Sequence, residues 1–510
     1  MIEAWSTADV RAAEAPLLEA GVPLMERAAF ALAMQVLADL RARRRHARGA
    51  RVALLVGAGN NGGDALHAGA VLARRGVGVT AVLVSERTHA GGLVALRSAG
   101  GHVVELFADP SRTAAVAAGA VSGDVVLDGL VGIGARGALR GAAADLVTAV
   151  TDALGGAPAP WIVAVDLPSG IGADDGTVDG PVLPAGRTVT FGAAKPGLLL
   201  PPAARTVGEL TVVDIGLTFE GTRSAPALRQ LDARDVGGAW PVPGPADHKY
   251  TRGVVGLVAG TPTYPGAAVL AASAAVRAGA GMVRYRGPEA VGHAVLAVRP
   301  EVVVAHGRVQ SWVVGPGLPT DDEGQRDRSR GGLAEARGDT GAHGAVPAVV
   351  DAGGLDLLEP PCPPWFVLTP HAGELATLLQ RYGERADRRD VEAAPLRWAR
   401  RAHELTGATV LLKGGVTVVV GPGGAFAQAD APAWLSTAGA GDVLAGLLGA
   451  MLAARSADVV ERPALAADIA AAAALVHGHA ARRANPGGPV AALDVAEALP
   501  ATVAELVAQA

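Results

Sequence analysis

Short apolar runs alternate with longer amphipathic segments along the chain, and glycine-rich turns usually separate them. The run at 51–56 (RVALLV) has no polar position after its first residue, which is typical of a strand covered on both faces. The segment at 64–76 instead spaces its apolar residues as a helix does. Strand, glycine turn and helix recur in this order, and the order predicts an α/β protein with parallel sheets.

The same pattern divides the chain into two parts. In the first part it predicts helices from Ser6 to about residue 40 and then strands at 51–56, 77–86, 124–128, 161–166, 188–191 and 209–217. The stretch 221–245 contains AWPVPGPAD, whose proline and glycine content is typical of a linker. Beyond it the strand, glycine loop and helix patterns return. We therefore predict domains at 1–220 and 246–505.

A polar stretch at 321–345 interrupts the second domain. It mixes charges of both signs with glycine, as in DDEGQRDRSRGG. Such a composition predicts either a flexible insertion or a charged, exposed helix, and we assign no chemistry to it.

Composition and charge narrow the possible functions. The 510 residues suffice for two large domains or three smaller ones, and the net charge of −5 offers no basic surface to nucleic acid or to an anionic membrane. The single cysteine, Cys362, excludes internal disulfides and cysteine-based zinc sites. The amino terminus, MIEAWSTADV, has no basic signal-peptide start, and no long apolar run follows it. We expect a cytoplasmic homo-oligomer without nucleic-acid or membrane partners.

Lysine and asparagine are rare in this chain, and most of them lie in glycine-rich loops. Only three of the 44 basic residues are lysines. The lysines and asparagines are Lys195, Lys249, Lys413, Asn60, Asn61 and Asn485. Arginine cannot replace lysine where a proton must move or where space is tight. These positions are therefore candidates for chemistry. The alternative is that they are ordinary surface residues that the chain has kept by chance.

A glycine loop follows the first predicted strand. The residues GAGNNGGD at 57–64 contain the pattern GxGxxG, and an acidic residue, Glu86, ends the next strand. This is the loose fingerprint of a dinucleotide-binding turn. The residues between and after the glycines of this loop are polar. Asn60, Asn61 and Asp64 supply oxygen atoms that suit an alkali or alkaline-earth cation.

Polar residues also stand at the ends of two later strands. Asp128 ends the run DVVLD, with a second glycine loop at 132–137, and Asp166 and Ser169 follow the run WIVAV. Because the carboxyl ends of parallel strands meet at one edge of a sheet, these groups can lie in one crevice. Lys195 lies in a glycine- and proline-containing turn after a further strand. Asp128 could instead cap a helix, and Lys195 could only stabilise the fold.

The stretch 436–450 (STAGAGDVLAGLLGA) joins a glycine loop to an apolar helix. Gly439 and Gly441 let the backbone approach a ligand, and a helix start offers unpaired N–H groups and a positive dipole end, which favour phosphate. Asp442 at that end suits a base or an orienting group beside a transferring phosphoryl group. The alternative is a structural turn capped by Asp442.

The motifs of the first domain resemble those of the YjeF N-terminal family, the NAD(P)H-hydrate epimerases. The matching pieces are GNNGGD, LDGLVGIGARG, DLPSG, FGAAKPG and VVDIGL, and together they cover nearly all of residues 1–218. The resemblance implies a Rossmann-like three-layer αβα domain that binds the R and S forms of hydrated NADH or NADPH together with K⁺. Ala65 departs from the family, which commonly has glycine there.

This resemblance also implies roles for particular residues. The potassium site would comprise Asn61, Asp128 and Ser169. The hydrated C6 is a hemiaminal-like carbon whose bonds break and re-form under acid–base catalysis, and Asp166 and Lys195 could carry those protons. The substrate-binding residues would be Asn60, Asn61, Gly62, Gly63, Asp64, Gly132, Ile133, Gly134, Ala135, Arg136, Gly137, Ala138 and Asp166.

The second domain resembles the YjeF C-terminal family, the ADP- or ATP-dependent NAD(P)H-hydrate dehydratases of the ribokinase-like group. The matching pieces are KYTRG, TYPGAA, GPGL, LTPHAGE, LKGGVT and TAGAGDVLAG, over about residues 246–500. The resemblance implies a ribokinase-like αβα domain that uses Mg²⁺ and, as is typical of bacterial members, ADP. Two positions depart from the family: DAG stands at 351–353 where DAD is usual, and Pro319 replaces a glycine.

By motif, the second domain would hold two ligands. The hydrated nucleotide would contact Ala267, Gly317, His371 and Asp442. The adenine nucleotide would contact Lys413, Gly414, Gly415, Val416, Thr417 and Gly441. In this interpretation Asp442 takes the proton of the C6 hydroxyl, that oxygen receives a phosphoryl group, and elimination of phosphate restores the dihydronicotinamide.

We therefore predict a repair enzyme that epimerises hydrated NAD(P)H and dehydrates its S form with ADP, giving AMP and phosphate. One alternative is a ribokinase-like kinase that releases a phosphorylated small alcohol, and the epimerase-like first half argues against it. Another is a first domain that only binds a dinucleotide. The constellation of Asn60, Asn61, Asp128 and Asp166 argues against mere binding.

Overall fold

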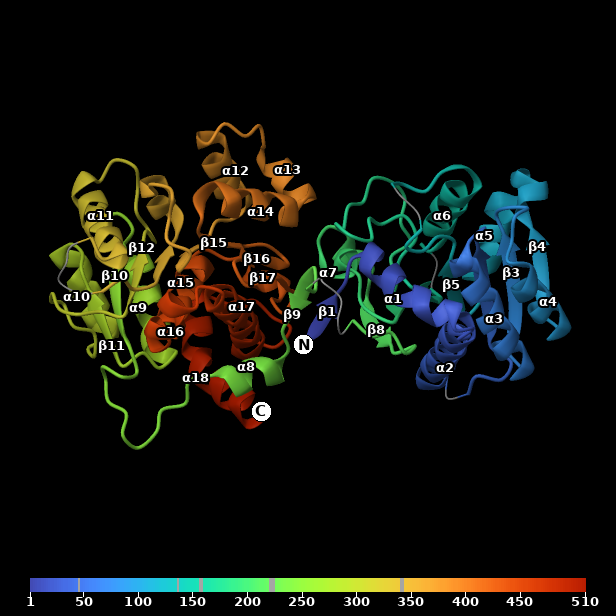
Figure 1. Cartoon of the computed structure of the whole chain (residues 1–510), viewed down its shortest axis with the longest axis horizontal. Helices are drawn as coiled ribbons and strands as arrows, with labels where there is room; N and C mark the ends of the chain where they lie inside the picture. The colour runs from blue at the N-terminus through green and yellow to red at the C-terminus, as the bar shows by residue number, and fades with distance from the viewer. Residues whose placement is uncertain (45, 135–136, 156–158, 220–224, 340–343) are drawn as a thin grey trace. The chain divides into compact units, whose positions relative to one another are not determined.

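The computed structural model describes residues 1–44, 46–134, 137–155, 159–219, 225–339 and 344–510. The chain divides into two compact units (Figure 1). The N-terminal unit comprises Glu3–Ala227, and the C-terminal unit comprises Leu228–Ala510 together with Met1–Ile2. Part of the predicted linker is therefore structured, because β9 (Leu228–Gln230) and α8 (Ala233–Ala239) belong to the C-terminal unit.

A seven-stranded parallel sheet forms the centre of the N-terminal unit. Its strands lie in the order β4-β3-β2-β5-β6-β7-β8, and Leu55 of β2 pairs with Asp128 of β5. The strands are β2 (Arg51–Val56), β3 (Gly78–Leu83), β4 (His102–Glu105), β5 (Val125–Gly129), β6 (Trp161–Val165), β7 (Arg187–Phe191) and β8 (Glu209–Val213).

Helices cover both faces of this sheet, so the predicted αβα arrangement is confirmed. Successive residues of β2 enter opposite cores: Leu54 packs with Leu32 and Leu66 of α2 and α3, whereas Leu55 packs with Leu146 of α6. The helices are α1 (Thr7–Glu19), α2 (Leu24–Arg44), α3 (Asn60–Arg74), α4 (Ala90–Ser98), α5 (Thr113–Val121), α6 (Gly141–Ala153) and α7 (Pro196–Leu199), with 3₁₀ turns η1 (Leu106–Ala108), η2 (Pro110–Arg112) and η3 (Ala203–Thr206).

The sheet of the C-terminal unit has ten strands in the order β1-β9-β17-β16-β15-β14-β13-β12-β10-β11. The run from β11 to β15 is parallel, and β15, β16 and β17 are antiparallel, so the chain turns back on itself after Lys413. The strands, besides β9, are β1 (Ile2–Ala4), β10 (Val254–Val258), β11 (Met282–Tyr285), β12 (Ser311–Val314), β13 (Ala348–Val350), β14 (Phe366–Leu368), β15 (Thr409–Leu412), β16 (Thr417–Gly421) and β17 (Gly424–Gln428).

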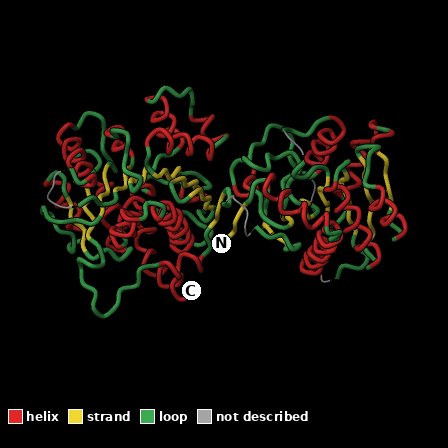
Figure 2. The backbone as a smooth tube through the Cα atoms, in the orientation of Figure 1, coloured by secondary structure: helices red, strands yellow, loops and turns green. Residues whose placement is uncertain are grey.

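Two helical layers enclose this second sheet, as Figure 2 shows with strands in yellow and helices in red. α9, α15 and α17 pack on one face, and α11 and α14 pack on the other (Figure 1). Besides α8, the helices are α9 (Pro265–Arg277), α10 (Glu289–Val298), α11 (Glu323–Arg337), α12 (Ala372–Arg381), α13 (Arg388–Ala393), α14 (Pro395–Thr406), α15 (Ala440–Ala454), α16 (Ser456–Glu461), α17 (Leu465–Ala484) and α18 (Ala492–Ala508), with η4 (Ala352–Leu357) and η5 (Ala433–Leu435).

In both sheets the strand order reverses beside a predicted glycine loop. β2 and β5 are neighbours in the first sheet, and β10 and β12 are neighbours in the second. At such a switch point the loops after the two strands lead in opposite directions and leave a crevice. The loop at 57–59 and Asp128 lie at the first switch point, and Ala267 and Gly317 follow the strands of the second.

Two helices begin inside the predicted glycine loops. α3 begins at Asn60, so Asn60, Asn61 and Asp64 lie in or next to the first turn of a helix and not in a loop. α15 begins at Ala440 after Gly439, whose φ of 86° lies in the left-handed region. In both cases the polar residues lie where helical N–H groups lack partners within the helix.

The charged stretch at 321–345 is mostly the helix α11, which buries Leu333 and Ala336, while residues 340–343 lie outside the described residues. The charged-helix alternative is therefore correct for 323–337. Within the described part of the chain, no single helix is long and apolar enough to cross a membrane. α1 and α2 reach that length and composition only as a pair, and they are bent by 114°.

Candidate functional site

A cavity of about 630 Å³ lies at the first switch point, beyond the carboxyl ends of β2, β5 and β6. Eight of the predicted residues line it: Asn60, Asn61, Asp64, Gly132, Ile133, Gly134, Asp166 and Lys195. The remaining lining residues are Arg11, Glu14, Ala58, Gly59, Leu130, Val131 and Phe191. The structure thus brings together strand ends that lie more than a hundred residues apart in the sequence.

Asp166 and Lys195 form a buried ion pair in this cavity. The Lys195 ammonium donates to Asp166 Oδ1 at 2.6 Å, to Thr190 Oγ1 at 2.9 Å and to the Phe191 carbonyl at 3.1 Å. Thr190 Oγ1 also donates to Asp166 Oδ1 at 2.9 Å. Among the described residues, Asp166 Oδ2 has no hydrogen-bond partner, so the second oxygen is available to a ligand.

The backbone of Asp166 is also unusual. Its φ of 65° lies in the left-handed region, which costs a non-glycine residue roughly 1–3 kcal/mol. The N–H of Asp166 donates to the Val189 carbonyl at 2.8 Å, which holds the turn on the neighbouring strand β7. Strained residues of this kind cluster at ligand sites, which agrees with the position of Asp166 in the cavity wall.

The three residues of the predicted potassium site gather around the backbone of Val131. The Asp128 carboxylate is fully buried and accepts from Ser169 N at 2.8 Å, Ser169 Oγ at 2.6 Å and Leu130 N at 3.3 Å. Asn61 Nδ2 donates to the Val131 carbonyl at 3.0 Å. Burial raises the pKa of Asp128, while the hydrogen bonds from Ser169 and Leu130 oppose that rise.

Other predicted residues of this unit lie outside the cavity wall. A Cβ on Gly62 would lie 2.3 Å from the Gly57 carbonyl oxygen, and one on Gly63 would lie 2.9 Å from the His89 ring, so both glycines serve close packing. Gly137 and Ala138 do not line the cavity, and Ala135 and Arg136 lie outside the described residues. The extra methyl group of Ala65 faces Gly129, whose missing side chain leaves room for it.

Two residues of α1 reach the cavity although no motif indicated them. Arg11 donates to the Ile133 carbonyl at 2.8 Å, and Glu14 lines the cavity beside Asp64 and Asp166. On sequence alone, both belong to the polar positions of an amphipathic helix, which normally face solvent. Only the tertiary fold shows that these positions face a cavity.

Lys413 is the centre of the polar cluster in the C-terminal unit. Its ammonium donates to Asp351 Oδ1 at 2.7 Å and lies 3.7 Å from Glu374 Oε2. Burial lowers the pKa of Lys413, but the charges of Asp351, Glu374 and Asp442 outweigh burial and raise it overall. Asp351 directly follows β13, and Thr369 Oγ1 also donates to its carboxylate, at 2.8 Å. The predicted lysine thus has an acidic partner that the motif assignment left out.

Asp442 lies in the first turn of α15, next to this cluster. Burial raises its pKa to about 7, the Asp351 charge adds to the rise, and the Lys413 charge opposes it. A Cβ on Gly441 would lie 3.3 Å from Lys413 Nζ, so the glycine brings the helix start close to the ammonium. His477 of α17 is buried nearby, and burial together with the Lys413 charge lowers its pKa to about 4.

The predicted contacts to the hydrated nucleotide lie around the second switch point. Gly317 has a φ of 64°, and a Cβ there would lie 2.6 Å from the Cβ of Ala267. His371 caps α12, because its Nδ1 accepts from Gly373 N at 3.1 Å and Glu374 N at 3.2 Å. The His371 backbone pairs with that of Lys413, which places the capping residue beside the polar cluster.

The two departures from the family pattern are neighbours in space. A Cβ on Gly353 would lie 2.0 Å from the carbonyl oxygen of Leu318, the residue before Pro319. A proline restricts the backbone of the residue before it, so Pro319 helps to fix where that carbonyl lies. In this backbone, position 353 has no room for the usual aspartate.

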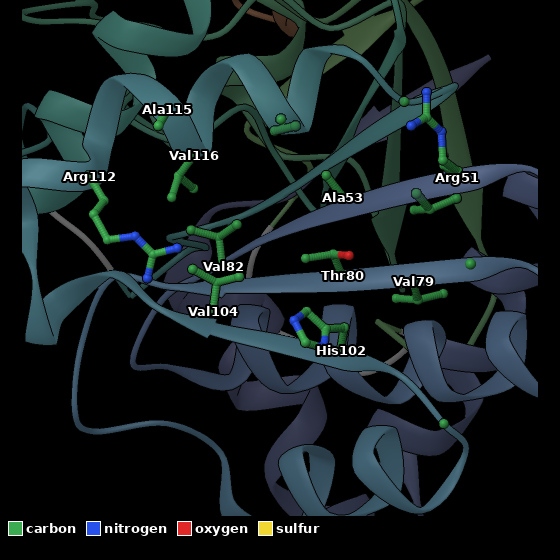
Figure 3. A pocket seen from close by; sticks show the side chains of 16 residues that line it. Arg51, Ala53, Val79, Thr80, Val82, His102, Val104, Arg112, Ala115 and Val116 are labelled. Carbon is green, nitrogen blue, oxygen red and sulfur yellow. The ribbon is translucent and has the colours of Figure 1, made fainter.

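A second cavity in the N-terminal unit, of about 530 Å³, contains none of the predicted site residues. Figure 3 shows Thr80, Val82 and Val104 along the sheet, with Val116 of α5 facing them and Arg112 to one side. This cavity lies along the face of β2, β3 and β4 and not beyond the carboxyl ends of the strands, where parallel sheets bind ligands. We therefore assign no part of the reaction to it.

The two units define a class of protein: a fusion of two α/β domains, each with ionisable groups at a switch point of its sheet. Residues 21–197 match the family described as YjeF-related protein N-terminus, and residues 255–500 match the family described as NAD(P)H-hydrate dehydratase. The chain is 45% identical over 467 residues to the bifunctional NAD(P)H-hydrate repair enzyme Nnr of Mycobacterium tuberculosis, covering 88% of this chain and 89% of that protein. The chain belongs to the family of bifunctional NAD(P)H-hydrate repair enzymes, which confirms the resemblance noted for both halves.

Single-domain proteins match each half. The NAD(P)H-hydrate epimerase of Clavibacter sepedonicus is 46% identical over 222 residues, which cover 43% of this chain and 93% of that protein. A crystal structure of the ADP/ATP-dependent NAD(P)H-hydrate dehydratase from Bacillus subtilis, obtained with ATP and Mg²⁺, is 23% identical. It covers 55% of this chain and 100% of that chain, with a TM-score of 0.46.

Proposed function

We propose that this chain epimerises the R and S forms of hydrated NADH and NADPH and dehydrates the S form with ADP, giving AMP and phosphate. The observation that carries the dehydratase half is Asp442, whose pKa burial raises to about 7, at the N-terminus of α15 beside Lys413. A carboxyl group with that pKa can accept a proton at neutral pH, and the helix start favours an anion.

Dehydration requires a better leaving group than hydroxide. Asp442 takes the proton of the C6 hydroxyl while that oxygen attacks the terminal phosphorus of ADP, and AMP leaves. Loss of phosphate from C6 and of a proton from the neighbouring carbon then restores the dihydronicotinamide. The first-turn N–H groups of α15, at Gly441 and Asp442, stabilise the charge on the transferring phosphoryl group.

The adenine nucleotide would lie along Lys413, Gly414, Gly415, Val416, Thr417 and Gly441. Lys413 supplies the cation, and its ion pair with Asp351 fixes the position of the ammonium. Mg²⁺ would neutralise the phosphate oxygens of the nucleotide. Among the described residues, Asp351 Oδ2 accepts no hydrogen bond, so Asp351 would offer this oxygen to the ion while Asp442 stays free to act as the base.

Epimerisation is assigned to the cavity of the N-terminal unit. Asp166 accepts the C6 hydroxyl proton through Oδ2, and Lys195 holds Oδ1 and orients the carboxylate. K⁺ would be held by the oxygens of Asn61, Asp128 and Ser169 and by the Val131 carbonyl, and it would supply positive charge beside the substrate. A fully buried carboxylate among neutral oxygen donors fits a monovalent cation.

The two activities complement each other, because the epimerase supplies the S form that the dehydratase consumes. The test supplies chemically hydrated NADH with ADP and Mg²⁺ and follows the dihydronicotinamide absorbance. Complete recovery, faster than spontaneous epimerisation allows, is the expected result. No recovery would overturn the dehydratase assignment. A stable phosphorylated product would favour a kinase instead, and recovery that stops at one form would overturn the epimerase assignment.

A further inference from the structure

α1 contributes two side chains to the N-terminal cavity that no sequence motif and no assigned role includes. Arg11 and Glu14 are three positions apart, which places them on one face of the helix. Both line the cavity together with Asp64, Asp166 and Lys195. Glu14 is therefore an ionisable group in the cavity wall to which the epimerisation proposed above gives no role.

The position of α1 is fixed at several points. Thr7 donates to Asp174 through its N–H and its hydroxyl, both at 2.7 Å, and the Trp5 N–H donates to the Ala194 carbonyl at 2.9 Å. One turn before Glu14, Arg11 holds the carbonyl of Ile133. These contacts hold the helix against the loop beside Lys195 and against the glycine loop at 132–134, so Glu14 has a defined place.

Charge in the cavity is unbalanced. Three carboxyl groups, those of Glu14, Asp64 and Asp166, face the cavity, together with only two cations among the described lining residues: Arg11, which donates to the Ile133 carbonyl, and Lys195, whose ammonium binds the carboxylate of Asp166. Among the described residues, Asp64 Oδ1 is buried without a hydrogen-bond partner, and the Glu14 carboxyl group has none either. Carboxylates that crowd one site cannot all ionise readily, so at least one of them keeps its proton at a higher pH than usual.

We propose that Glu14 is a catalytic acid–base residue of the epimerisation and that it acts together with Asp166. The proposal rests on the epimerase function proposed above. Two proton-transfer groups are required because the hemiaminal opens by two coupled transfers. As Asp166 takes the hydroxyl proton, the C6=O bond forms and the C6–N1 bond breaks, and Glu14 gives its proton to N1.

Closure reverses these steps on the other face of the carbonyl. Rotation about the C5–C6 bond turns that face towards N1, which attacks C6 while Glu14 recovers the proton from N1. Asp166 returns its proton to the oxygen and completes the opposite epimer. The sequence is redox-neutral and needs no further reactant.

The environment of Glu14 favours its protonated form. Burial raises its pKa, the Asp166 charge raises it further, and the Lys195 and Arg11 charges lower it. Burial also raises the pKa of Asp64 well above its usual value, with Asp166 and Glu14 adding to the rise. A carboxylic acid and an ion-paired carboxylate in one cavity form the pair that general acid–base catalysis uses.

The test uses the full chain, hydrated NADH containing both forms, ADP and Mg²⁺. In the wild type the S form gives a fast phase of absorbance recovery, and the R form gives a slower phase limited by epimerisation. E14Q should slow the second phase by about 10²–10⁴-fold, towards the rate without protein, and should leave the fast phase unchanged. E14D should restore part of the rate because it restores the acid.

The matched control is E19Q, which changes an exposed glutamate on the same helix and should retain both phases. In the wild type, the rate of the slow phase should fall as rising pH deprotonates Glu14. The slow phase of E14Q should not show this fall. A slow-phase rate in E14Q within about threefold of the wild-type rate would overturn the proposal. The same fall of this rate with rising pH in E14Q would also overturn it. A wild type without a slow phase faster than the spontaneous rate would overturn the epimerase function itself.

Discussion

Lys413 Nζ lies 2.7 Å from Asp351 Oδ1, and this ion pair sets the charge balance of the C-terminal site. The same ammonium lies 3.7 Å from Glu374 Oε2, so one cation already faces two carboxylates. The Lys413 ammonium therefore offsets the negative charge of Asp442 only in part. For this reason burial can raise the pKa of Asp442 to about 7. The cluster supplies a fixed cation for a phosphate and a separate carboxyl group that titrates near neutral pH.

Substituting Asp442→Asn should lower the dehydratase rate by about 10²–10⁴-fold, because the variant has no base for the C6 hydroxyl. In the wild type, kcat/KM should rise with pH through about 7 as Asp442 ionises, and D442N should lack this dependence. The measurement is absorbance recovery from the S form across a pH series. Chromatographic separation of the two forms, which are diastereomers, supplies the control, since D442N should still interconvert them. A pH-dependent D442N would show that another group is the base.

Asp442 should also make stability depend on pH. The pKa of Asp442 in the folded protein, about 7, lies above the ordinary value of 3.8. Between these two pH values the folded state therefore holds a proton that the unfolded state has lost. The contribution of Asp442 is therefore most favourable below about pH 4 and is lost as pH rises through about 7. Denaturant unfolding of wild type and D442N should show the wild type losing stability relative to the variant across this window. A constant difference would contradict the prediction.

Lys195→Met should destabilise the N-terminal unit by about 3–5 kcal/mol, because it leaves the buried carboxylate of Asp166 without its cation. The chain offers a matched control in Lys249→Met, which removes an exposed lysine and should change the free energy of unfolding by no more than about 0.5 kcal/mol. Denaturant titration of both variants measures the difference. Equal changes in the free energy of unfolding of the two variants would show that the ion pair of Lys195 with Asp166 adds no stability of its own.

Gly317→Ala should destabilise the C-terminal unit by about 1–2 kcal/mol for the left-handed backbone alone, with a further cost from the contact with Ala267. Ala267→Gly removes the methyl group that this new Cβ would meet 2.6 Å away. The double variant should therefore be more stable than the sum of the single changes predicts. A double-mutant cycle measures this coupling, and strict additivity would show that the two positions do not share the space.

The sequence predicts best those residues whose position follows from the sheet. Asp128 and Asp166 end apolar runs, and parallel strands bring such ends to one edge, so their meeting at the first switch point could be inferred. The scarcity of lysine was informative in the same way. Lys195 and Lys413 both hold carboxylates at the predicted sites, whereas Lys249 is exposed and lies 5.2 Å from the Tyr250 ring.

Other features depend on contacts between elements, which a linear pattern does not contain. Glu14 has the sequence context of a solvent-facing helical residue, and only the docking of α1 turns it into the cavity. Gly62 belongs to the substrate loop by motif, yet the nearby Gly57 carbonyl explains why a side chain is excluded. The early start of α3 was missed because Asn60 and Gly62 are poor helix formers that the tertiary packing overrides.

The potassium proposal predicts an ion effect on stability as well as on rate. Replacing K⁺ with tetramethylammonium at equal ionic strength should lower the thermal unfolding temperature, because an ion that binds only the folded state stabilises it by mass action. Asp128→Asn removes the buried charge beside Asn61 and Ser169, so this variant should lose the response to K⁺ whatever its own stability.

Asp152→Asn, an exposed change in α6 of the same unit, is the control and should keep the full response to K⁺. The slow epimerisation phase should follow the same order, with the wild type and D152N stimulated by K⁺ and D128N indifferent to it. Because the unfolding measurement needs no substrate, it tests ion binding separately from turnover. An equal K⁺-induced rise in unfolding temperature in D128N would place the ion away from Asp128.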